Sequence, residues 1–174
     1  MRKIAVILGS KSDLRQCLDG LKFLKEHEGQ EIECTGVYIA SQHRNTLYVQ
    51  MLLSELVKTK VDAIIVFAGW ANHLTGCCDA FLRYTLHDSK IVVIGGGLED
   101  ENNPQHTLAA KISITEVPGT QVVHADEGGF FGGSTGFLRA CRFAVLRSLP
   151  TIKLPDKKET NHLVLAEAIK IAAQ

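Results

Sequence analysis

The stretch IAVILGSKSD at residues 4–13 indicates the fold most clearly. Five consecutive apolar residues, from Ile4 to Leu8, are typical of a strand buried on both faces, and Gly9 ends this run. Apolar residues from Leu14 onward then recur at helical spacing, with Asp13 as the expected N-cap. A buried strand that turns directly into an amphipathic helix is the first half of a βαβ unit.

The same alternation continues along the chain. Further strands are predicted at residues 32–40, 61–68 and 90–94, with helices at residues 47–57 and 76–86. Successive strands about 30 residues apart fit βαβ units. This pattern predicts an α/β fold: a three-layer α/β/α sandwich with a flavodoxin-like parallel sheet. No G-x-G-x-x-G follows the first strand, which argues against a dinucleotide-binding Rossmann fold.

The second half of the chain is less regular. We expect a polar loop at residues 98–105 and short strands at residues 112–114 and 121–123, on either side of a Pro-Gly turn. The Gly-rich residues 128–133 suggest a flexible segment, and residues 134–146 suggest a long helix that ends before Pro150.

Two segments follow from this pattern. Residues 1–150 are expected to form one α/β/α catalytic domain, and residues 151–174 a linker with a C-terminal helix. A linker ahead of an amphipathic helix suggests an arm that packs on a neighbouring subunit. Packing of this helix on its own domain is the alternative.

Composition limits the classes of function. The chain has 174 residues, 45% of them hydrophobic, and a formal net charge of zero, so nothing indicates binding to nucleic acid or to an anionic membrane. Five cysteines lack a CxxC spacing and are expected to be reduced thiols rather than zinc ligands. Neither a signal peptide nor an apolar run of roughly 20 residues is visible, so a cytoplasmic protein is expected.

Three polar loops follow three predicted strands, at residues 9–13, 41–44 and 68–76. The carboxyl ends of parallel strands meet at one edge of a sheet, where ligands bind. Serine hydroxyls at a helix start and the guanidinium of Arg44 suit a phosphate group, and His43 can transfer a proton near neutral pH. The small residues around Trp70 would let a planar base approach, and Trp70 could stack on it or close the pocket.

Each loop also has a purely structural interpretation. Gly, Ser and Asp are common in strand–loop–helix turns, and Asp13 could simply cap the helix. A histidine near a strand end is often only a satisfied polar residue. Trp70 could be a half-buried side chain in a glycine-rich turn.

Taken together, the three loops resemble those of one family. GSKSD at residues 9–13 matches the family pattern GSxSD, SQHR at 41–44 matches SAHR or SAHK, and AGWANHLTG at 68–76 is similar to AGGAAHLPG. On these motifs the chain resembles the N5-carboxyaminoimidazole ribonucleotide mutase family, which includes the catalytic subunit of phosphoribosylaminoimidazole carboxylase. The resemblance covers the first half of the chain and weakens after Gly97.

The resemblance implies a carboxylate shift in purine biosynthesis, from N5-carboxyaminoimidazole ribonucleotide to 4-carboxy-5-aminoimidazole ribonucleotide. It implies a homo-octamer, a small phosphorylated substrate, and no metal or organic cofactor. Arg44 rather than Lys favours the mutase over direct carboxylation. By motif position the resemblance assigns the catalytic roles to His43 and His73. It assigns the phosphate and ribose site to Ser10, Ser12, Asp13, Ser41 and Arg44. It assigns the base pocket to Gly69, Trp70, Asn72 and Leu74.

The chain departs from the family pattern near the base. Trp70 and Asn72 replace small residues, Thr75 replaces proline, and Gln42 replaces alanine. These changes keep open a divergent member that acts on or senses another phosphorylated, nucleotide-like molecule. A third possibility is a non-catalytic sensor of phosphorylated ligands or a flavodoxin-like FMN carrier.

Overall fold

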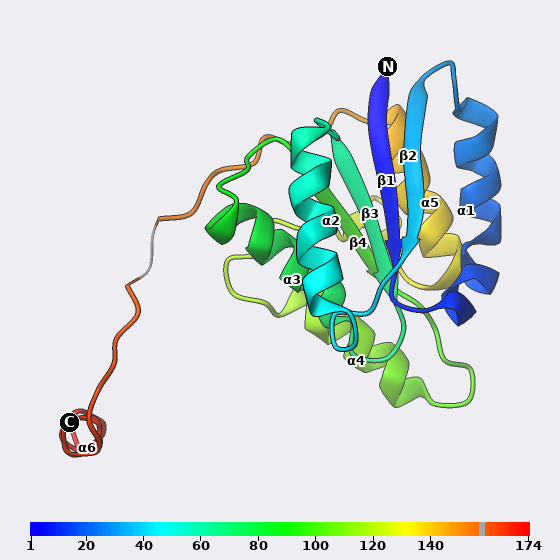
Figure 1. Ribbon diagram of the computed structural model, residues 1–174. Coiled ribbons are helices and arrows are strands. Elements are labelled where there is room, and N and C mark those ends of the chain that lie inside the picture. The colour runs from blue at the N-terminus through cyan, green and yellow to red at the C-terminus, as the bar shows by residue number, and fades with distance from the viewer. Residues whose placement is uncertain (157–158) are drawn as a thin grey trace.

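The computed structural model describes residues 1–156 and 159–174. Its centre is a parallel sheet of order β2-β1-β3-β4, the flavodoxin-like arrangement that the sequence predicts (Figure 1). The strands are β1 (Arg2–Leu8), β2 (Ile32–Ile39), β3 (Ala63–Ala68) and β4 (Val92–Gly97).

Helices cover both faces of this sheet, which confirms the predicted three layers (Figure 1). One face carries α1 (Leu14–His27) and α5 (Gly133–Leu146). The other carries α2 (Thr46–Lys58), α3 (His73–Ala80) and α4 (Pro104–Thr115), and α3 continues as the π-helical turn η2 (Phe81–Thr85).

The alternation of side chains along the strands builds two cores. In β1, Ile4, Val6 and Leu8 face the core beneath α1 and α5, whereas Ala5 and Ile7 face the core beneath α2 and α3. All five are fully buried, as expected of a central parallel strand. Because β1 is buried on both faces, its position in the sheet is fixed, and so is the position of the loop that follows Leu8.

The prediction that the fourth strand ends at residue 94 is wrong, because β4 runs on through three glycines to Gly97. These positions lack room for a side chain. A Cβ on Gly95 would collide with Thr75, and one on Gly96 would collide with the carbonyl oxygen of Phe131. The glycines therefore permit close packing within the strand and do not end it.

Two predictions for the second half need correction. Residues 112–114 belong to α4 and form no strand, since Pro104 and the Asn103 cap start a helix that continues to Thr115. Residues 121–123 do lie beside β4, but only Val123 pairs with it, through one parallel bridge to Ile94. The predicted loop at 98–105 gives way to α4 at Pro104.

The glycine-rich segment has regular structure. Strands β5 (Ala125–Asp126) and β6 (Gly129–Phe130) pair as a small antiparallel hairpin, and Arg139 of α5 forms an ion pair with Asp126. The Arg139 hydrogen bond lowers the pKa of the Asp126 carboxyl.

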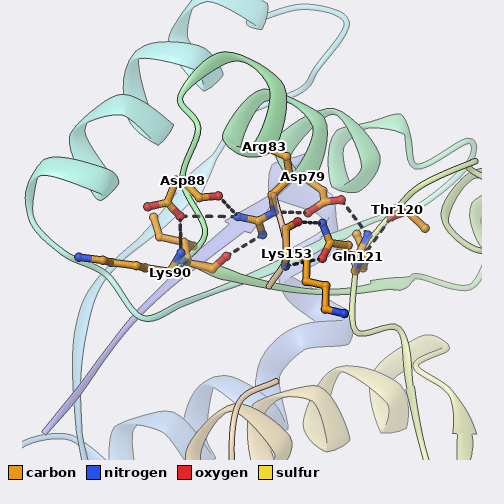
Figure 2. A network of polar contacts seen from close by, with 9 residues as sticks. Asp79, Arg83, Asp88, Lys90, Thr120, Gln121 and Lys153 are labelled. Carbon is orange, nitrogen blue, oxygen red and sulfur yellow. Dashed lines mark hydrogen bonds and ion pairs between the residues drawn. The ribbon is translucent and has the colours of Figure 1, made fainter. Parts of the chain in front are cut away.

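A polar network around the buried pair Arg83 and Asp79 extends to Lys153, just after the expected domain boundary (Figure 2). The guanidinium of Arg83 donates to Asp79 Oδ1 at 3.0 Å and to the carbonyl oxygens of Asp88 and Ile91 at 2.8 and 2.7 Å. Asp79 Oδ2 accepts from the Gln121 backbone at 2.9 Å, and Gln121 Oε1 accepts from the Lys153 backbone at 2.9 Å. Residues just after the expected boundary at 150 are thus still held by the body.

Beyond this anchor the chain leaves the sandwich. Ile152 is buried in the core, whereas α6 (Leu165–Ala172) lies apart from the other helices and buries no residue (Figure 1). The predicted C-terminal helix is therefore present, and it occupies only the last part of residues 151–174. Within the described ranges, no helix is long and apolar enough to cross a membrane.

Replacing Arg83 with leucine should lower the free energy of unfolding by about 3–5 kcal/mol, because Asp79 would remain buried without its cation. Urea denaturation measures this loss. The matched control, Arg15→Leu on the exposed surface of α1, should change stability by about 0.5 kcal/mol or less. A loss for Arg83→Leu no larger than that of the control would contradict a structural role for the network.

Candidate functional site

A pocket of about 420 Å³ opens at the carboxyl ends of β1, β2 and β3. The connection from β1 leads to one neighbour, β2, and the next connection returns to the other neighbour, β3, so the loops diverge at β1. Such a switch point is where open α/β sheets bind ligands. The lining residues are Gly9, Ser10, Ser12, Asp13, Ser41, Gln42, His43, Arg44, Ala68, Gly69, Trp70, Ala71, Asn72 and Leu74.

The structure thus brings ten of the eleven predicted site residues to one pocket. The exception is His73, which is absent from the lining but contacts His43. Gln42 also lines the pocket, although its residue type predicts no role there; its place between Ser41 and His43 is the signal that points to it.

Two hydroxyls face each other in the first loop. Ser10 caps the short 3-10 turn η1 (Lys11–Asp13), and its Oγ lies 2.9 Å from Ser12 Oγ. Arg44 reaches this loop from the end of β2, where its guanidinium donates to the Gly9 carbonyl oxygen at 3.4 Å. Two hydroxyls and a cation at a helix start can bind a phosphate group.

The carboxylate of Asp13 is not used for capping the helix that follows it. Asp13 stands at the N-cap position of α1, as expected, but its side chain makes no hydrogen bond to the helix start. Its Oδ2 atom is buried and finds no hydrogen-bond partner among the residues that the structure describes. Burial raises the pKa of the Asp13 carboxyl, and Arg44 opposes this shift only in part. The pocket therefore contains an acceptor that a ligand hydroxyl could satisfy.

Two imidazoles meet at the ends of β2 and β3. His43 Nε2 lies 3.1 Å from His73 Nδ1, and the rings are nearly perpendicular at 79°. A hydrogen bond between two ring nitrogens needs one N–H and one lone pair, so the tautomer of His73 and the tautomer of His43 depend on each other. The contact brings two histidines from separate loops together beside the pocket.

Asn72 has a structural role that its position in the motif does not indicate. The side chain is buried, its Oδ1 accepts from the Thr75 backbone at the start of α3, and its Nδ2 donates to the Gly96 carbonyl oxygen at 2.9 Å. Thr75 in turn donates to the Val66 carbonyl oxygen at 3.2 Å. The polar atoms of Asn72 thus hold the third loop against β4.

Trp70 is 65% exposed, so its interpretation as a half-buried turn residue is wrong. Its indole stacks on the imidazole of His106, with ring centroids 3.9 Å apart. His106 lies in α4, a segment expected to be partly loop, and no sequence signal linked it to the pocket. In the part of the chain that the structure describes, no three metal-binding side chains come together.

Comparison with known proteins agrees with this geometry. The family model described as AIR carboxylase matches residues 3–123. The N5-carboxyaminoimidazole ribonucleotide mutase of Saccharolobus solfataricus is 29% identical over 74% of each chain. The mutase of Methanocaldococcus jannaschii is 42% identical over 42% of each chain.

Among solved structures, a serine-to-aspartate variant of Treponema denticola PurE2 is similar, with a TM-score of 0.50 and 24% identity over 68% of this chain and 67% of that chain. This likeness supports the fold alone. The family model, in contrast, covers all four strands of the sheet and every loop of the pocket. The chain belongs to the AIR carboxylase family.

Proposed function

We propose that this chain is an N5-carboxyaminoimidazole ribonucleotide mutase, which moves a carboxylate from the exocyclic nitrogen to ring carbon C4. The observation that carries this proposal is the His43–His73 contact beside the loops that can bind phosphate, in a pocket of about 420 Å³. A volume of this size suits one small molecule. The family membership and the two mutases among its relatives support the same reaction.

Substrate binding uses the polar groups at the first two loops. Ser12, Ser41 and Arg44 bind the 5′-phosphate, with Ser10 beside them. The unpartnered Asp13 carboxylate accepts hydrogen bonds from ribose hydroxyls. The base then extends toward the third loop, next to Gly69, Trp70 and Leu74.

The chemistry needs one proton that leaves and returns. His43, protonated, donates to the exocyclic nitrogen as the carbamate releases carbon dioxide. Ring carbon C4 attacks the trapped carbon dioxide, and His43 then takes the C4 proton, which restores the aromatic ring and its own charge. Confinement keeps the carbon dioxide at high effective concentration, and His73 orients the His43 ring throughout.

Replacing His43 with asparagine should lower kcat by about a hundredfold or more, because general acid–base catalysis contributes on that order. The assay follows loss of N5-carboxyaminoimidazole ribonucleotide. His87→Asn, at an exposed histidine outside the pocket, is the matched control and should keep full activity. Absence of turnover by the unchanged protein would defeat the proposal.

Replacing Asp13 with asparagine should increase the stability of the protein and weaken its binding of substrate. Burial raises the pKa of the Asp13 carboxyl and so disfavours its ionised form in the folded state, and the neutral amide should therefore raise the stability of the protein at neutral pH. The amide lacks the charge of the carboxylate and carries an N–H donor in place of one acceptor oxygen, so weaker binding of the ribose hydroxyls should raise KM by about tenfold.

Thermal melts and steady-state kinetics test this pair of effects. The control is Asp19→Asn, which removes an exposed carboxylate from α1 and should change neither quantity. A destabilised Asp13→Asn protein with unchanged KM would show that the carboxylate serves the fold instead of the ligand.

A second candidate is a divergent enzyme or sensor for another phosphorylated, nucleotide-like molecule. The exposed indole of Trp70, at a position where the family has a small residue, favours this alternative. Thermal-shift screening of nucleotides and sugar phosphates separates the two, since the mutase should be stabilised best by aminoimidazole ribonucleotide.

The C-terminal arm completes the proposal as a contact between subunits of a cytoplasmic homo-octamer. On α6, Leu165 and Ile169 are 77% and 60% exposed, and on α2, Leu47 and Met51 are 69% and 63% exposed. Apolar surface of this extent on separate elements favours burial between copies. The five free thiols fit a reducing compartment.

Deleting residues 159–174 should lower the number of subunits per particle in solution without unfolding the sandwich, because α6 buries no residue within its own chain. Light scattering coupled to gel filtration measures the mass. Leu165→Glu with Ile169→Glu should act in the same way, and Glu167→Gln on the same helix is the control. An unchanged number of subunits in the deletion variant would contradict the proposed role of the arm.

A further inference from the structure

Trp70, the single tryptophan of the chain, adopts an unusual backbone conformation at the edge of the pocket. Its φ is 57°, in the left-handed region that glycine occupies without cost and bulky residues seldom occupy. Such a conformation persists only where surrounding contacts determine it, and it is concentrated at functional sites. The contacts that hold Trp70 are therefore informative.

The first of these contacts is a parallel stack on His106. The two ring planes are 18° apart and their centroids are separated by 3.9 Å. The imidazole is held at both nitrogens: Nδ1 lies 2.7 Å from Asp100 Oδ2, and Nε2 lies 3.1 Å from Asn103 Nδ2. Because Asn103 Oδ1 accepts from the Gln105 backbone, its amide nitrogen faces His106. His106 thus donates from Nδ1 and accepts at Nε2.

Asp100 is itself fixed to the loop before α4. Its Oδ1 accepts from the backbone nitrogens of Asn102 and Asn103 at 3.0 and 3.2 Å. The hydrogen bond from His106 lowers the pKa of the Asp100 carboxyl, which remains ionised at neutral pH. The carboxylate, the imidazole and the indole therefore form a continuous brace from this loop to the pocket.

The brace leaves one face of the indole open. His106 covers one side of the ring, yet 65% of Trp70 is exposed, so the opposite side and the edges are accessible. Trp70 lines the pocket without filling it, since about 420 Å³ remains. A fixed, flat apolar surface beside a phosphate site suits the planar ring of a nucleotide.

We propose that Trp70 is the stacking surface for the heterocyclic ring of the substrate, and that His106 and Asp100 are positioning residues that hold it. This proposal rests on the proposed function and adds to it the basis of ring recognition. The site then selects phosphorylated ribosides that carry a planar aromatic ring over ribose phosphates that lack one. His43 and His73 keep the proton transfer, and the brace sets where the ring lies.

The fluorescence of Trp70 provides a direct test, since no other tryptophan contributes to it. Titration of the full-length protein with aminoimidazole ribonucleotide should quench or shift the emission. Ribose 5-phosphate, which lacks the ring, should compete for the site and leave the emission unchanged. In His106→Ala the ribonucleotide should bind about tenfold more weakly. Equal responses to both ligands, or none to the ribonucleotide, would overturn the proposal.

Kinetic variants test the same proposal without the fluorescence signal. Trp70→Gly should fold at least as well as the unchanged protein, because glycine removes the backbone strain at φ 57°. KM should rise about tenfold, the loss expected for one base–aromatic stack, with kcat changed by about twofold or less. The KM of Trp70→Gly combined with His106→Ala should be no higher than that of Trp70→Gly alone, because both substitutions disrupt the same stacked pair.

Tyr48→Ala, at an exposed aromatic residue of α2 outside the pocket, is the control and should leave KM unchanged. A Trp70→Gly enzyme with full turnover and a KM within about twofold of the original would overturn the stacking surface while leaving the mutase reaction intact. Absence of turnover by the unchanged protein, with a ring-specific fluorescence response, would instead defeat the proposed reaction and support the stacking surface.

Discussion

Parallel pairing of β1 with both β2 and β3 is the constraint on which the site depends. The strand is buried on both faces, and its register with each neighbour is fixed by apolar side chains of alternating direction. Parallel strands end at the same edge, so the first three loops must converge there. A slip of one residue in β1 would reverse its two faces and misplace Ser10, Ser12 and Asp13 together.

Within the pocket, hydrogen-bonding state separates residues that serve the fold from residues available to a ligand. Asn72 and Asp13 both line the pocket as polar side chains. The amide of Asn72 is fully used by Thr75 and Gly96, whereas the buried Oδ2 of Asp13 has no partner in the described part of the chain. Motif position alone assigns both residues to the substrate, and the hydrogen bonds distinguish them.

Local patterns were sufficient for the first half of the fold. Continuous apolar runs and helical spacing predict β1, α1 and the sheet class, because double burial leaves a direct trace in sequence. The predicted end of the fourth strand at residue 94 is too early, because β4 continues through glycines that Thr75 and Phe131 approach closely from distant segments. Residues 112–114 were misassigned because β-branched residues favour strands, while the Asn103 cap and Pro104 decide for a helix.

In the candidate site, too, some features could be predicted from local sequence patterns and others could not. The three loops, with their serines, arginine and histidines, could be predicted because each follows a recognisable strand. Contacts across the sheet edge could not: His43 meets His73 across 30 positions, and His106 reaches Trp70 from α4. The exposed indole on a left-handed backbone follows from this second contact, and no pattern within residues 68–76 indicates it.

The central claim is that this pocket transfers a carboxylate within one bound nucleotide. The most direct measurement supplies N5-carboxyaminoimidazole ribonucleotide with a ¹³C-labelled carboxyl group, in buffer containing unlabelled bicarbonate, and follows the label by mass spectrometry. Retention of most of the label in 4-carboxy-5-aminoimidazole ribonucleotide is expected, because the released carbon dioxide stays in the pocket until C4 attacks it. No product, or product whose label matches the bulk bicarbonate, would contradict a mutase.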